Sequence, residues 1–138
     1  MLREFSERCE TIEECYEFML AYAGQGVPGE EGGGGQIRNY LARAQEALAG
    51  LPDAYMEAVQ LRNLEPTASY QAFEEVLARD AHSSLAAIEM VLVQPRISSQ
   101  LIDNLNASIH LRALLTDLFL IDEIIKVQRL TDKPASTV

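Results

Sequence analysis

The chain has 138 residues, of which 48% are hydrophobic and 23% are charged. This length and balance are typical of one globular domain, and they exclude collagen-like and intrinsically disordered classes. The formal net charge is −10. Because such a surface repels nucleic-acid phosphates and anionic lipids, we expect neither a nucleic acid nor a membrane as a partner.

The N-terminal residues carry charges from Arg3 onward and contain no apolar run of the kind found in a signal peptide. The longest apolar run, residues 18–23, is far shorter than the ~20 residues that cross a bilayer. Cys9 and Cys15 would lie ~9 Å apart along a helix, too far for a disulfide between them. These features predict a cytoplasmic protein.

Apolar residues recur every three or four positions through residues 2–23, which predicts an amphipathic helix ending at Gly24. The next segment, residues 24–35, is rich in glycine, and we expect it to form a flexible loop. A second helical segment is predicted from Gln36 to about Asn63.

Pro52 lies inside the second helical segment, so we expect a kink or a break there. A third helix is predicted from Ser69 to a stop before Pro95. The fourth begins at Ser98 or Ser99 and runs to about Arg129.

These four segments predict an all-α fold, an antiparallel four-helix bundle whose second helix is kinked or broken near Pro52. We expect residues 1–130 to form a single helical-bundle domain. The polar segment 131–138 contains a proline and is expected to be a disordered tail.

The fourth predicted helix is apolar on two sides. One stripe contains Leu111, Leu114, Leu115, Leu118, Ile121 and Ile125. The second stripe contains Ile109, Ala113, Leu120, Ile124 and Val127. A helix of this kind is either central in its fold or packed against another chain. We favour self-association and predict a homodimer with the second stripe at its interface.

His82 is a candidate phospho-acceptor, because helical spacing places it on a predicted exposed face. In this respect the chain resembles histidine phosphotransfer domains, which are also small, often acidic four-helix bundles with an exposed histidine. The Leu-Lys-Gly sequence typical of those domains just downstream of the histidine is incomplete, since the lysine and the glycine are both missing. An ordinary surface histidine is the simpler interpretation.

Four polar residues are candidates for a polar core or a ligand site between the helices: Asp80, His110, Asp117 and Asp122. Neither histidine stands in the Glu-x-x-His pattern that di-iron bundles need, so no metal site is predicted. The five tyrosines follow helical spacing, which favours core packing over the lining of a pocket.

Glutamates three and four positions apart form a strip on the first helix, at Glu10, Glu13, Glu14 and Glu17. We interpret the strip as a solvated face, which attracts a partner with a basic surface. No set of nucleophile, base and oxyanion donors can be assembled, and no cofactor is predicted.

The sequence therefore predicts a small acidic accessory or regulatory protein that acts by protein–protein interaction and is not an enzyme. The alternatives are a histidine phosphotransfer-type signalling module that uses His82, and a metal or small-ligand binder within the bundle.

Overall fold

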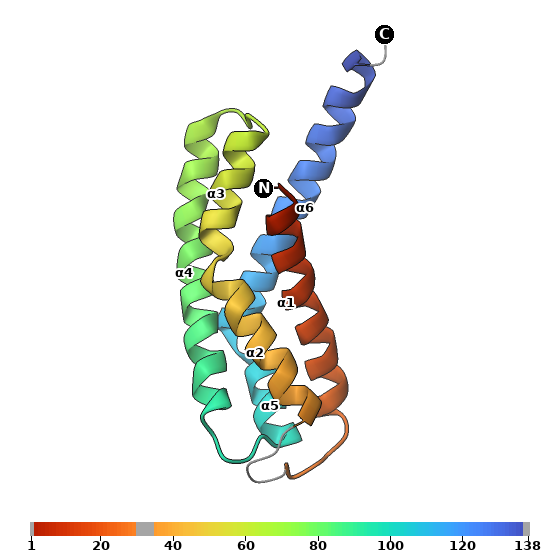
Figure 1. The fold of residues 1–138 in the computed structure, drawn as a ribbon, viewed down its shortest axis with the longest axis vertical. Coiled ribbons are helices and arrows are strands. Elements are labelled where there is room, and N and C mark those ends of the chain that lie inside the picture. The colour runs from red at the N-terminus through yellow and green to blue at the C-terminus, as the bar shows by residue number, and fades with distance from the viewer. Residues whose placement is uncertain (1, 30–34, 137–138) are drawn as a thin grey trace.

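A computed structural model describes residues 2–29 and 35–136, with side chains for residues 3–29 and 35–128. Over these residues the chain is all-helical, which confirms the predicted all-α class (Figure 1). Its six helices are α1 (Leu2–Ala23), α2 (Gly35–Ala49), α3 (Leu51–Leu61), α4 (Thr67–Leu92), α5 (Ser99–Ala107) and α6 (Ile109–Ser136). Within the described residues, no helix has the length and apolar character needed to cross a membrane.

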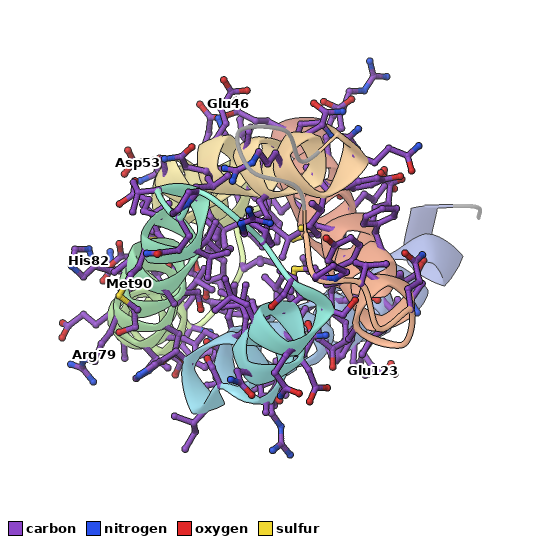
Figure 2. All side chains as sticks on the ribbon, turned by 90° about the horizontal axis from the view of Figure 1, so that it is seen from below. Glu46, Asp53, Arg79, His82, Met90 and Glu123 are labelled. Carbon is purple, nitrogen blue, oxygen red and sulfur yellow. The ribbon has the colours of Figure 1, made fainter. Side chains whose placement is uncertain are left out.

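The helices surround one apolar core. α1 packs against α2, α3 and α5, whereas α4 packs against α2, α3 and α6. Seen end-on in Figure 2, the α2–α3 and α5–α6 pairs lie on opposite sides, with α1 and α4 between them. Each of the six helices contributes a large side chain that is at most 2% exposed: Ile12, Leu41, Leu51, Leu77, Ile102 and Leu114.

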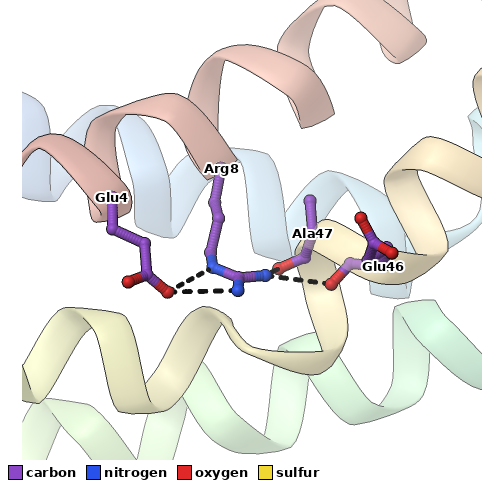
Figure 3. Close-up of polar contacts among 4 residues, drawn as sticks. All are labelled: Glu4, Arg8, Glu46 and Ala47. Atoms are coloured by element: carbon purple, nitrogen blue, oxygen red, sulfur yellow. Dashed lines mark hydrogen bonds and ion pairs between the residues drawn. The ribbon is translucent and has the colours of Figure 1, made fainter.

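One residue, Gly50, separates α2 from α3, and Pro52 lies in the first turn of α3. A helix that ends leaves carbonyl groups without intrahelical partners. Arg8 of α1 supplies donors to them, since its Nη1 donates to the carbonyls of Glu46 (3.0 Å) and Ala47 (3.2 Å) (Figure 3). A Cβ at position 50 would lie 2.6 Å from the Arg8 guanidinium carbon, so any larger residue there would displace the Arg8 side chain.

A second arginine has the same role at the C-terminus of α4. Arg38 of α2 donates from Nη1 to the carbonyl of Leu92 (2.8 Å) and from Nη2 to that of Gln94 (2.6 Å). Neither α2 nor α4 has a basic residue in its own last turn. Arginines from neighbouring helices therefore satisfy the carbonyl ends of both helices.

The single helix expected from Ser98 or Ser99 to about Arg129 is instead divided at Ser108 into α5 and α6. Ser108 has an extended backbone (φ −63°, ψ 135°), and its Oγ accepts a hydrogen bond from the N–H of Leu111 (3.3 Å). Serine is a favoured N-cap because its side chain replaces a missing backbone acceptor. The helix α6 continues to Ser136, and the predicted disorder of residues 131–138 stays a prediction.

The described part of the predicted flexible loop is held against the start of α5. Val27 donates from its N–H to Ser99 Oγ (2.9 Å) and accepts from the Ser99 N–H (2.9 Å). Gly29 has φ +84°, and a Cβ there would lie 2.7 Å from the carbonyl oxygen of Ile97. The remaining residues of the predicted loop, 30–34, lie outside the described residues.

Candidate functional site

The two apolar stripes of α6 have different environments. The first stripe faces the core, and five of its members are at most 6% exposed: Leu111, Leu114, Leu115, Leu118 and Ile121. The second stripe lies at the surface, where Ile109 is 74% exposed, Val127 52% and Leu120 49%. Its other two members, Ala113 and Ile124, are half-buried. An interface role for the second stripe stays a prediction.

Large exposed apolar side chains are concentrated on α6. Among the nine found in the described part of the chain, four belong to this helix: Ile109, Phe119, Leu120 and Val127. Singly scattered apolar residues are normal on protein surfaces, whereas large contiguous apolar patches are uncommon on monomeric proteins.

Two of the four candidate polar-core residues meet between α4 and α6. Asp117 is 8% exposed, and its Oδ2 atom is buried without a hydrogen-bond partner among the described residues. Burial raises the pKa of Asp117 from 3.8 to about 8, with further contributions from a side-chain hydrogen bond to Asp80 and from the Asp80 charge. A protonated Asp117 can donate the hydrogen bond that two carboxylates lack.

The other two candidates do not join this pair. His110 is exposed at the start of α6, where its backbone carbonyl accepts a hydrogen bond from the buried Ser84 hydroxyl (3.0 Å). Asp122 is exposed and forms an ion pair with Lys126 (3.3 Å). The four residues thus do not form one site, because helical rotation points His110 and Asp122 away from the α4–α6 contact.

An apolar cavity of about 290 Å³ lies among α1, α3, α4 and α6. In Figure 1, α1 begins below the upper ends of α3, α4 and α6, and above this point α6 diverges from the α3–α4 hairpin. Four aromatic side chains line the cavity: Phe5, Tyr55, Tyr70 and Phe73. Four aliphatic side chains of α6 complete one wall: Leu120, Ile121, Ile124 and Ile125.

Few polar groups line this cavity. The Tyr55 hydroxyl donates to the carbonyl of Tyr70 (3.0 Å), and Gln128 Nε2 donates to the Tyr70 hydroxyl (3.5 Å). Burial raises the pKa of Tyr55 to about 12, with smaller contributions from Tyr70 and Glu74, so this hydroxyl stays a donor at neutral pH. Among the described lining residues, Arg62 alone carries a charge.

The sequence did not reveal the cavity. Tyr55 and Tyr70 were two of five tyrosines for which core packing was favoured, and the structure places both in the lining. The tyrosine pattern was therefore a signal, but Arg62 stands outside every motif. The position of Arg62 in the cavity lining depends on where α3 ends relative to α6.

Acidic side chains gather where α1 and α6 meet, and we call this surface the acidic seam. Phe5 lines both this surface and the apolar cavity. A cleft there is lined in part by Cys9, Glu10, Glu13 and Asp122. Burial raises the pKa of Glu13, and the charges of Asp122, Glu10 and Glu17 raise it further. This concentration of negative charge favours a cationic partner. Within the described residues, no group of three or more histidine, cysteine, aspartate or glutamate side chains is arranged to hold a metal ion.

The remaining reactive side chains are dispersed. His82 is exposed on the outer side of α4 (Figure 2), so its role as a phospho-acceptor stays a prediction. Cys9 and Cys15 are free thiols, as their spacing predicts. Burial raises the pKa of each to about 12, which disfavours the reactive thiolate at neutral pH.

Comparison with known proteins places the chain in no group, since no protein-family model, no curated protein and no solved structure matches it.

Proposed function

We propose that this chain is a cytoplasmic accessory or regulatory protein, not an enzyme, that acts by binding another protein and that self-associates as a homodimer. The exposed apolar stripe on α6 carries the proposal. Ile109 is 74% exposed, Val127 52% and Leu120 49%. All three lie on one flank of a helix whose other flank is buried.

Self-association follows from the position of this stripe. A two-fold dimer needs one surface patch that is complementary to itself, and an apolar helix flank meets that need when two copies pack antiparallel. Two α6 helices joined along Ile109, Leu120 and Val127 remove these side chains from water, which is the dominant favourable term in association.

The acidic seam supports a second partner with a basic surface. Burial raises the pKa of Glu13, and the nearby charges of Asp122 and Glu10 raise it further. Complementary charge steers the encounter and raises the association rate, and salt screens it.

We also propose that the six helices are organised as an antiparallel four-helix bundle. In this organisation α2 and α3 form the second rod, broken at Gly50, and α5 and α6 form the fourth rod, divided at Ser108. Two observations support this organisation. A single residue separates the two helices of each pair. Each pair also packs against both α1 and α4: α2 and α3 contact both helices, α5 contacts α1, and α6 contacts α4.

Sedimentation equilibrium of wild type, Ile109→Glu and Leu120→Glu tests the homodimer. We expect wild type at twice the protomer mass and both variants at the protomer mass, because each dimer would bury two unpaired carboxylates. Met90→Glu is the matched control, since Met90 is 66% exposed on the outer side of α4 (Figure 2). It should leave the mass unchanged.

Circular dichroism accompanies each measurement. Ile109 and Leu120 are exposed, so their variants should keep the helical spectrum of wild type. A folded variant of unchanged dimer mass would exclude the stripe as the interface, and a wild-type monomer at every concentration would exclude the homodimer.

A further inference from the structure

We propose that the cavity among α1, α3, α4 and α6 binds a small amphipathic carboxylate, with its hydrocarbon part inside the cavity and its carboxylate paired with Arg62. The cavity shares Leu120 and Ile124 with the second stripe of α6, whereas Arg62 and the aromatic residues of its lining lie outside that stripe.

The size and the chemistry of the lining select the apolar part of the ligand. The volume of about 290 Å³ lies at the lower end of the range for ligand pockets, which fits a short chain or one ring system. Phe5, Tyr55 and Phe73 supply aromatic walls, and Ile121 and Ile124 supply aliphatic ones. An empty space among such groups forfeits dispersion contacts, and an apolar guest restores them.

The charge of the lining selects the head group. Arg62 is half-buried, follows the last residue of α3, and forms no ion pair with the described residues. A guanidinium group binds a carboxylate through two parallel hydrogen bonds and is more weakly hydrated than an ammonium group. In a protein of net charge −10, an arginine as the charged member of an apolar lining favours an anionic head over a cationic one.

Two further polar groups line the same cavity. Ser69 lines the cavity near the start of α4, and the Tyr70 hydroxyl receives a hydrogen bond from Gln128, so its own proton is available to an acceptor. A few polar groups in an apolar lining fix the orientation of a ligand.

Isothermal titration calorimetry with three probes of equal chain length tests the proposal on the full chain. Decanoate, decanol and decyltrimethylammonium differ in head charge and are each used below the concentration at which they aggregate. We expect decanoate to bind about tenfold or more tightly than decanol, the ratio that a hydrogen-bonded charge pair contributes. Decyltrimethylammonium should bind most weakly.

Substitutions then locate the site. Arg62→Gln should reduce decanoate affinity to the level of decanol and leave decanol binding unchanged. Arg79→Gln is the matched control, because Arg79 is exposed on the outer side of α4 (Figure 2), and it should change neither affinity. Ala58→Phe should abolish binding of both probes, because Ala58 lines the cavity and a ring would fill it.

If Ala58→Phe fails to fold, the comparison of Arg62→Gln with Arg79→Gln still tests whether Arg62 binds the carboxylate. Equal decanoate affinity in wild type and Arg62→Gln would overturn the proposal, as would the absence of binding heat with decanoate. A decanoate affinity that persists in a folded Ala58→Phe variant would place the ligand outside the cavity and would also overturn it.

Discussion

The two flanks of α6 differ in how fully their side chains are partnered. On one flank, Leu114 and Leu118 are at most 1% exposed, and even the polar Asp117 has a neighbouring carboxyl group on α4. On the other flank, Ile109 and Leu120 are apolar and face solvent. One helix therefore contains a surface that the fold needs and a surface that the fold leaves uncovered.

The difference shows what apolar periodicity means in this chain. Both stripes repeat with helical spacing, so both satisfy the pattern for burial. One stripe is enough to attach α6 to the rest of the protein, and the second stripe is in excess of that need. The proposed function rests on this excess.

The largest expected difference is between a charge on each flank. Leu118→Glu places an unpaired carboxylate in the core, and we expect it to cost more than about 4 kcal/mol and to unfold the chain. Ile109→Glu should change the free energy of unfolding of the protomer by no more than about 0.5 kcal/mol. Urea unfolding followed by circular dichroism measures both. Similar losses in the two variants would remove the distinction between the flanks.

The second prediction concerns the pH dependence of the buried flank. The folded chain retains the Asp117 proton up to about pH 8, whereas the unfolded chain releases it near the ordinary pKa of 3.8. The unfolded state therefore binds fewer protons between these values, and stability falls as pH rises, by up to about 1.4 kcal/mol per pH unit. Asp117→Asn cannot ionise and should lose less stability than wild type between pH 5 and pH 8.

Urea unfolding at both pH values measures this difference. Glu123→Gln is the matched control, because Glu123 is exposed on the same helix (Figure 2). Its pH dependence should follow that of wild type. Parallel curves for wild type and Asp117→Asn would show that the carboxyl pair does not hold a proton in the folded state.

The two helix breaks extend the comparison to how helix ends are satisfied. At Gly50 the donors come from another helix, so Arg8→Met should cost about 2 kcal/mol by leaving the carbonyls of Glu46 and Ala47 unpaired. Arg43→Met is the control, since Arg43 forms an exposed ion pair with Glu14 (3.4 Å) and should cost under about 1 kcal/mol. Equal costs in thermal or urea unfolding would contradict the capping role of Arg8.

At Ser108 the cap comes from the residue at the break itself. Ser108→Ala removes the acceptor for the Leu111 N–H and should cost about 1 kcal/mol. Ser6→Ala is the control at an exposed position within α1, where alanine is a good helix former and no loss is expected. A loss in Ser6→Ala as large as that in Ser108→Ala would remove the special role of Ser108.

The sequence predicted the bounds of α1, 2–23, because an unbroken apolar repeat ends at a glycine. It did not predict the division at Ser108, because serine and asparagine also occur within helices and apolar spacing continues across the break. Contacts with residues distant in the sequence, which no local pattern contains, hold the chain at this break. Asn106, two residues before Ser108, donates from Nδ2 to the carbonyl of Met19 (3.2 Å).

The candidate site was predictable only in part. The sequence separated the two stripes of α6 by periodicity alone, and it included Asp80 and Asp117 in one polar group. It also added His110 and Asp122, because the rotation of α6 relative to α4 is set by packing and not by local pattern. The cavity beside Arg62 depends on the divergence of α6 from the α3–α4 hairpin, which no local pattern records.

Native mass spectrometry of the untagged protein, purified from its own host in gentle salt, tests the central claim most directly. We expect a homodimer, with or without a second protein, and loss of the homodimer when Ile109→Glu is prepared in the same way. A wild-type protein that is a bare protomer would contradict the claim that this chain acts by binding another protein.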